Sequence, residues 1–192
     1  MRISKCGIGR CVDGLPSIEC ELSALAIGVK PSNQKVNMST TQALSPALAE
    51  LQAIQTISAA QGLPYAGQVP PALAWQLFSA DEALLVDVRS AEERKFVGHV
   101  PGSLHVAWAT GTALTRNPRF ARELEAKTGK DAVVLLLCRS GKRSALAAEV
   151  AAKAGFKLVF NVLEGFEGEI DAQQHRGVSD GWRFRELPWV QD

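Results

Sequence analysis

The chain of 192 residues has no long apolar run and almost no excess of charge of either sign. No stretch approaches the roughly 18 consecutive apolar residues that a membrane-spanning helix needs. A formal net charge of +1 gives no bulk attraction to nucleic acid or to a membrane surface. Internal repeats and low-complexity tracts are lacking as well. From these absences we expect neither nucleic acid nor a membrane as a partner, and an ordinary soluble globular protein.

Cysteine is also scarce, with four residues in the whole chain. Cys6, Cys11 and Cys20 lie near the start, without the C-x2-C pairing of a zinc site and without a nearby histidine. We therefore expect no metal and no other cofactor. Four cysteines so unevenly spaced do not make a disulfide scaffold. A lone reactive thiol such as Cys138 persists best in a reduced compartment, which predicts a cytoplasmic protein.

The segment 1–37 has no pattern that assigns it to a fold. It begins with basic residues, but its one apolar patch is short and follows Glu19 and Glu21, which argues against a secretory signal. We expect residues 1–37 to be disordered or not translated, with translation starting at Met38. Mass spectrometry of the native N-terminus tests this hypothesis, because a peptide from residues 11–30 would contradict it.

Residues 38–64 are expected to form a helical extension. The pair Ser45-Pro46 is typical of a helix start, with Ser45 as the N-cap and Pro46 at the first helical position. Four apolar residues follow at helical spacing: Leu48, Leu51, Ile54 and Ile57. This stripe favours packing against the rest of the chain over a surface for a partner.

From residue 65 onward, short apolar runs alternate with segments of helical pattern. Strands are expected at 65–69, 84–88, 104–106, 132–137 and 158–162. Helices are expected at 70–79, 90–96, 118–127, 144–154 and 164–172. Residues 108–117 are expected to be irregular. The alternation predicts an α/β fold of three layers, in which a mainly parallel five-stranded sheet is flanked by helices. Ligands of such sheets bind at the carboxyl ends of the strands.

The strongest local signal is the apolar run at 132–137, which ends in Cys138 and a short polar loop. The run is typical of a strand buried on both faces, and a helix is expected to begin near Arg143 or Ser144. Such a turn directs backbone N–H groups inward, and the helix N-terminus adds partial positive charge. Three cations reinforce that field: Arg139, Lys142 and Arg143. Cys138 is thus expected to be a nucleophilic thiolate near neutral pH, with an ordinary buried cysteine as the alternative.

The loop and the segments around it resemble the rhodanese sulfurtransferases. Residues 138–144, Cys-Arg-Ser-Gly-Lys-Arg-Ser, are similar to the catalytic loop of that family. Other segments resemble its further signature elements in the same order: 87–89, 92–96, 98–103, 161–166, 181–182 and 187–189. The resemblance spans about residues 65–190, and it implies a rhodanese-like domain over residues 65–192.

The resemblance implies an enzyme, a thiosulfate sulfurtransferase. Cys138 is then the catalytic nucleophile, which takes a sulfane sulfur from thiosulfate or a similar small anionic donor and keeps it as a persulfide. A thiophilic acceptor, either cyanide or a thiol that can belong to a protein, removes that sulfur. Substrate binding is assigned to the rest of the loop: Arg139, Ser140, Gly141, Lys142, Arg143 and Ser144.

Three upstream residues are expected to support the site rather than to react. Asp87 and Arg89 stand at the end of a strand, where they can cap backbone groups and form a buried ion pair. Glu92 or Glu93 is a further candidate partner for Arg89. His99 lies between two turns that contain glycine, and we expect it to hold loop backbone by hydrogen bonding rather than to act as a general base.

The chain departs from the family pattern in two ways. About a dozen additional residues, 169–180, separate the Gly-Phe element from the Gly-Trp element, and they form either a flap beside the site or a plain surface loop. Many family members contain two tandem domains, whereas the motifs occur once in this sequence. A single-domain protein is therefore implied.

Two alternative functions belong to the same fold. Phosphatases and arsenate reductases of this fold have a loop one residue longer, with arginine at the sixth position after cysteine. Here Arg143 is at the fifth position, and the shorter ring suits a sulfur atom better than a tetrahedral phosphoryl group. The other alternative is a non-catalytic rhodanese-like binding module or a sulfur-carrier partner. Binding modules usually replace the cysteine, whereas Cys138 is intact.

Overall fold

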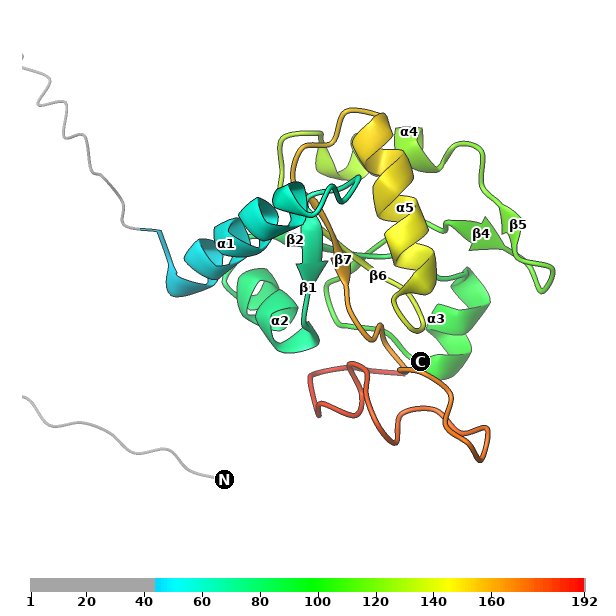
Figure 1. Cartoon of the computed structure of the whole chain (residues 1–192). Helices are drawn as coiled ribbons and strands as arrows, with labels where there is room; N and C mark the ends of the chain where they lie inside the picture. The colour runs from blue at the N-terminus through cyan, green and yellow to red at the C-terminus, as the bar shows by residue number, and fades with distance from the viewer. Residues whose placement is uncertain (1–43, 192) are drawn as a thin grey trace, which may run out of the picture. The chain divides into compact units, whose positions relative to one another are not determined.

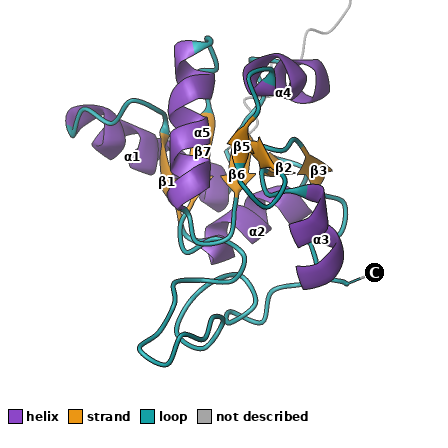
Figure 2. Cartoon of the chain, turned by 90° about the vertical axis from the view of Figure 1, so that its right-hand side faces the viewer, coloured by secondary structure: helices purple, strands orange, loops and turns teal. Residues whose placement is uncertain are grey.

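The computed structural model describes residues 44–191, so the predictions for residues 1–37 lie outside the described residues. In chain order, this range contains α1 (Pro46–Ala60), β1 (Gly67–Val69), α2 (Pro71–Ser79), β2 (Leu84–Asp87), α3 (Ala91–Val97), β3 (Leu104–His105), β4 (Ala109–Thr110), β5 (Thr115–Arg116), α4 (Phe120–Thr128), β6 (Val134–Leu137), α5 (Lys142–Lys153) and β7 (Val159–Val162). Their arrangement is shown in Figures 1 and 2. None of the helices in residues 44–191 is long and apolar enough to cross a membrane.

Five strands form one parallel sheet in the order β1-β7-β6-β2-β3. β6 is the central strand, where Leu135 is paired with Leu85 of β2 and with Phe160 of β7. All four residues of β6 are buried, as expected for a strand that is covered by helices on both faces. The predicted fold class, a mainly parallel five-stranded sheet flanked by helices, is confirmed.

Helices cover the two faces of the sheet in separate layers (Figures 1 and 2). One apolar core joins α1 and α2 to the sheet through Leu51, Leu77 and Leu135. A second core joins α4 and α5 to the opposite face through Leu124 and Leu136. Neighbouring residues of β6 belong to different cores because side chains alternate along a strand. The carboxyl ends of the strands lie at the same edge as α3 and the long segment after β7 (Figure 1).

Two helices begin with side-chain caps. The hydroxyl of Ser45 accepts a hydrogen bond from the Leu48 amide (3.1 Å) at the start of α1, as the sequence predicts. At the start of α3, the Ser90 hydroxyl accepts from the Glu93 amide (3.3 Å), and the Glu93 carboxylate accepts from the Ser90 amide (3.1 Å). This reciprocal capping box fixes the backbone and the carboxylate of Glu93 at the carboxyl edge of the sheet.

A short antiparallel hairpin replaces the irregular structure expected at 108–117. β4 pairs with β5, and Ala109 lies opposite Arg116. The alternating pattern that predicts strands is too short to detect in two-residue strands. The tip of this hairpin, residues 111–114, reaches the site described below.

The helix expected at 164–172 is absent, and that prediction is wrong. Glu164, Gly165 and Gly168 have positive φ angles of 65°, 68° and 83°, which a right-handed helix does not contain. The segment therefore forms a loop. A smaller difference concerns α5, which begins at Lys142, slightly earlier than expected.

Candidate active site

Cys138 lies directly after β6, in the loop that connects the centre of the sheet to α5. Its side chain is 1% exposed and belongs to the core beneath α4 and α5. The hydroxyl of Ser144, in the first turn of α5, lies 3.1 Å from Cys138 Sγ. Gly141 caps the helix with a φ of +83°, a left-handed conformation that suits glycine. The structure thus contains the predicted sequence of strand, cysteine, loop and helix.

Backbone N–H groups at the start of α5 have no hydrogen-bond acceptor among residues 44–191. The first hydrogen bond of this helix runs from the Ala145 amide to the Gly141 carbonyl (3.1 Å). The amides of residues 142–144 therefore have no acceptor within the helix. Ser140 is half-buried in the same loop. Free amides at a helix N-terminus, with the helix dipole behind them, form a binding site for an anion.

The segment after β7 packs directly against this loop. The Phe166 amide donates a hydrogen bond to the Cys138 carbonyl (2.7 Å). A Cβ on Gly165 would lie 2.5 Å from the Arg139 carbonyl carbon and 2.5 Å from the Ser140 amide nitrogen, so only glycine permits this approach. The sequence pattern by itself predicts no separate role for Gly165. A glycine shortly after a buried strand often marks the close approach of two backbone segments, and this feature of the sequence could have identified Gly165.

Arg143 is held by Glu93 of α3. Its Nη1 and Nη2 atoms lie 2.8 and 2.6 Å from the two carboxylate oxygens, which is a bidentate pair. This hydrogen bonding raises the pKa of Arg143. Burial alone would raise the pKa of Glu93, but the hydrogen bonds from Arg143 and from the Ser90 amide outweigh it, so the pKa of Glu93 is lowered. The pair therefore stays ionised and fixed beside the loop.

The other two cations of the loop differ in their partners. Lys142 is 76% exposed and forms an ion pair with Glu169 (3.0 Å). Arg139 is exposed, and within residues 44–191 it pairs with no carboxylate. Lys142 and Arg143 are thus each paired with a carboxylate. Arg139, the third cation predicted to bind a donor, is paired with no carboxylate of the described residues.

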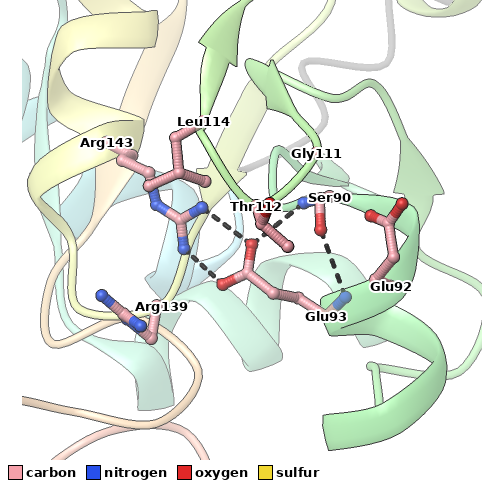
Figure 3. A pocket seen from close by; sticks show the side chains of 8 residues that line it. All are labelled: Ser90, Glu92, Glu93, Gly111, Thr112, Leu114, Arg139 and Arg143. Carbon is pink, nitrogen blue, oxygen red and sulfur yellow. Dashed lines mark hydrogen bonds and ion pairs between the residues drawn. The ribbon is translucent and has the colours of Figure 1, made fainter.

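A pocket of about 380 Å³ adjoins the loop (Figure 3). It lies between the active-site loop, the start of α3 and the tip of the β4–β5 hairpin, and its lining residues are Ser90, Glu92, Glu93, Gly111, Thr112, Leu114, Arg139 and Arg143. Cys138 is not among them, so the pocket lies beside the Cys138 side chain and does not contain it. The volume is that of a site for a small organic molecule.

Asp87 and Arg89 form the predicted ion pair, and both side chains are fully buried. Nε and Nη2 of Arg89 lie 3.0 and 2.7 Å from the two carboxylate oxygens of Asp87. The Phe166 ring lies 4.1 Å from the guanidinium carbon, so this pair supports the segment behind the active-site loop. Among the described residues, Arg89 forms no ion pair with the other candidate partners, Glu92 and Glu93.

His99 contacts the end of the chain through its backbone. Its amide donates to the Val190 carbonyl (2.8 Å), and its carbonyl accepts from the Val190 amide (2.9 Å). The buried imidazole Nδ1 has no hydrogen-bond partner among residues 44–191. The expected restraint on this loop is therefore supplied by the main chain of His99 and not by its side chain.

The additional residues 169–180 form an irregular loop that is closed at its base. The Asp180 carboxylate accepts from the Glu169 amide (2.8 Å), and a Cβ on Gly181 would lie 2.5 Å from the Gly168 nitrogen. The Glu169 side chain reaches Lys142 in the ion pair described above. This ion pair places the loop at 169–180 beside the loop that follows Cys138.

Comparisons with known proteins agree with this architecture. The rhodanese-like domain family matches residues 70–170. An uncharacterized protein of Rickettsia rickettsii is 35% identical over 118 residues, which cover 59% of this chain and 87% of that protein. A putative sulfur carrier protein of Bacillus subtilis is 35% identical over 91 residues, which cover 47% of this chain and 43% of that protein. The crystal structure of Rv0390 from M. tuberculosis has a TM-score of 0.61 and 44% identity, and the match covers 67% of this chain and 99% of that one. The chain belongs to the rhodanese-like domain family.

Proposed function

We propose that the protein is a sulfurtransferase that carries a sulfane sulfur on Cys138. The proposal rests on the position of Cys138 Sγ. This atom lies 3.1 Å from the Ser144 hydroxyl, at the start of a helix whose first amides have no hydrogen-bond acceptor within the helix. A negatively charged sulfur in this place is stabilised by the hydroxyl, the amides and the helix dipole. Membership of the rhodanese-like domain family supports the proposal.

In the first half-reaction, the Cys138 thiolate attacks the outer sulfur of thiosulfate or of a similar small anionic donor. A bond forms between Sγ and this sulfur, the sulfur–sulfur bond of the donor breaks, and its electron pair leaves with sulfite. The product is a Cys138 persulfide with the negative charge on its terminal sulfur. No proton is transferred, so the step needs no general base.

In the second half-reaction, a thiophilic acceptor attacks the terminal sulfur of the persulfide. The acceptor is cyanide in an assay, or the thiolate of a small molecule or a protein. A bond forms between the acceptor and the terminal sulfur, the persulfide bond breaks, and its electron pair returns to Cys138. The thiolate is regenerated, which closes a ping-pong cycle without a cofactor or a metal.

Donor binding is assigned mainly to Arg139. Arg139 forms no ion pair with a described carboxylate, whereas the guanidinium of Arg143 is paired with Glu93 and the ammonium of Lys142 with Glu169. We expect the donor oxygens to contact Arg139 and the free loop amides, with the outer sulfur directed at Cys138. A cationic loop favours thiosulfate over a donor of lower charge such as mercaptopyruvate.

A sulfur carrier is the second candidate function. The Bacillus subtilis relative is named a putative sulfur carrier protein, and a carrier needs the same persulfide on Cys138. A carrier differs from an enzyme because it passes its sulfur to a specific partner and does not turn over with small acceptors. Phosphatase activity is disfavoured because Arg143 is five positions after Cys138. Phosphate release from an aryl phosphate above background would contradict that argument.

Steady-state kinetics test the proposed enzyme. Thiocyanate formation is measured while thiosulfate is varied at several fixed cyanide concentrations, and parallel double-reciprocal plots are expected from a ping-pong cycle. Cys138→Ser is expected to form no thiocyanate above background. Mercaptopyruvate and glutathione persulfide complete the donor panel, in which thiosulfate should give the highest kcat/KM. Undiminished activity of Cys138→Ser would contradict the proposal, and persulfide formation without turnover would favour the carrier.

A further inference from the structure

Asn161 of β7 contacts the hydroxyl group that contacts the reactive sulfur. Its Oδ1 atom lies 2.6 Å from Ser144 Oγ, and Oγ lies 3.1 Å from Cys138 Sγ. The side chains of all three residues are almost completely buried, with exposed fractions of 3%, 0% and 1%. Bulk water therefore does not compete for these contacts, and the three polar groups must satisfy one another.

The Ser144 hydroxyl lies near more hydrogen-bond acceptors than it can donate to. A hydroxyl has one proton, yet Cys138 Sγ, the Gly141 carbonyl and Asn161 Oδ1 all lie within hydrogen-bonding distance. The Gly141 carbonyl can accept a second hydrogen bond, but it already accepts one from the Ala145 amide (3.1 Å) and so does not depend on the Ser144 proton. The remaining competition for the Ser144 proton is between the sulfur of Cys138 and the amide of Asn161.

We propose that Asn161 is a positioning residue that determines, through the two ends of its amide, whether the Ser144 hydroxyl donates to Cys138. This inference rests on the proposed sulfur chemistry of Cys138. While Cys138 is a thiol, its S–H donates to Ser144 Oγ, and Ser144 donates to Asn161 Oδ1. When Cys138 is a thiolate, Ser144 donates to Sγ instead.

The thiolate state requires the amide of Asn161 to rotate. Once the Ser144 proton points at sulfur, Oγ and Oδ1 would face each other as two acceptors 2.6 Å apart. Rotation about the last side-chain bond brings Nδ2 to that place, and it donates to Oγ. The two ends of an amide have nearly the same shape, so the rotation requires no additional volume in the core. Formation of the persulfide moves the charge to the terminal sulfur, and the amide turns back.

Other side chains of this size cannot perform both tasks. A carboxylate at position 161 can only accept, so it holds the Ser144 proton permanently and deprives the thiolate of its donor. An apolar side chain can neither accept nor donate. This requirement distinguishes Asn161 from a polar residue that merely fills a buried place on β7.

A double-mutant cycle tests the coupling without any sulfur donor. Thiolate formation at Cys138 is followed by ultraviolet absorbance against pH, as the difference between each variant and the same variant carrying Cys138→Ser. Asn161→Asp is expected to move the midpoint upward by about one pH unit or more, as loss of a hydrogen bond to a charged group implies. In a Ser144→Ala background, Asn161→Asp should move it by clearly less. An equal shift in both backgrounds would indicate charge repulsion alone and would overturn the proposal.

A second measurement uses the unaltered active site and so does not depend on the folding of the Asn161 variants. The side-chain amide signals of Asn161 are followed by NMR as the pH rises. They are expected to shift with the midpoint of Cys138 thiolate formation, and to lose that transition in Cys138→Ser. Signals that do not respond to Cys138 would overturn the proposal. Because neither experiment involves sulfur transfer, their outcome is independent of whether the chain is an enzyme.

Discussion

The charged side chains of the loop at 138–144 have different partners although they are only a few positions apart. Glu93 holds Arg143 through two short hydrogen bonds, and Glu169 holds Lys142 at the surface. Arg139 has no such carboxylate among residues 44–191. We therefore assign Arg143 to the architecture of the site and Arg139 to the donor.

Arg139→Ala is expected to raise the KM for thiosulfate by about tenfold, because a charge-assisted hydrogen bond contributes about 1.4 kcal/mol or more to binding. The kcat value should change much less, since the described hydrogen bond to Cys138 Sγ comes from Ser144 and not from Arg139. Lys142→Ala is the matched control, with an expected change in KM of less than about twofold, because its side chain is mostly exposed and already paired. Equal effects of the two substitutions in steady-state kinetics would contradict the assignment.

Glu93→Gln is expected to make stability less dependent on pH in the acidic range. The pKa of Glu93 is lower in the folded chain than its ordinary value of 4.5. Its stabilisation is therefore fully present above the unfolded value and is lost as the pH falls through the folded value. The substitution should cost about 1–3 kcal/mol at pH 7, as for hydrogen bonds between charged groups, and progressively less in acid.

Urea unfolding at several pH values measures this effect of Glu93. The control is Glu149→Gln, which removes an exposed pair with Lys153 and should cost about 0.5 kcal/mol or less at every pH. A loss of stability in Glu93→Gln that is the same at pH 7 and in acid would contradict the role of the Arg143–Glu93 pair.

At the level of secondary-structure elements, the loop after β7 supports the loop after β6. Gly165 allows the two loops to approach, and the Phe166 amide donates to the Cys138 carbonyl. The carboxyl ends of two neighbouring parallel strands thus build the site together, as is general for open α/β sheets.

Gly165→Ala is expected to impair the reaction as well as stability. Its Cβ would lie 2.5 Å from backbone atoms of Arg139 and Ser140, so the active-site loop must shift. Gly177→Ala is the matched control, since Gly177 has a similar φ of 71° but the nearest atom to its Cβ would be 3.8 Å away. Both should lose about 1 kcal/mol from backbone strain. Only Gly165→Ala should slow persulfide formation, by about tenfold or more, in single-turnover measurements. Equal rates for the two variants would contradict this role of Gly165.

The sequence predicts those elements whose causes are local. The buried run around Leu135 and the cap at Ser45 are determined by neighbouring residues, and both are present in the structure. The helix expected at 164–172 is absent because contact with the active-site loop holds Glu164 and Gly165 at positive φ. That contact is a tertiary one, so no pattern of neighbouring residues in the sequence can predict it.

The partners of the loop cations cannot be predicted from the sequence either, because these ion pairs also depend on tertiary contacts. Arg143 and Glu93 are 50 positions apart, and they meet because β6 lies beside β2 and α3 follows β2. The loop residues 138–144 could be identified, since they are contiguous and resemble a known motif. The division of their charges between structure and binding depends on how α3 and the loop at 169–180 pack around them.

The described part of the molecule places one cysteine, Cys138, where the central strand of a parallel sheet meets a helix N-terminus. The two apolar cores hold that strand from both faces, and the buried Asp87–Arg89 pair supports the segment behind the loop. We propose that this arrangement allows Cys138 to carry a sulfur atom.

The most direct test of that claim is peptide mass spectrometry after incubation with thiosulfate in the absence of any acceptor. The peptide that contains Cys138 is expected to gain the mass of one sulfur atom, to lose it again on addition of cyanide, and to gain nothing in Cys138→Ser. A wild-type peptide that gains no sulfur, or a gain that persists in Cys138→Ser, would contradict the account.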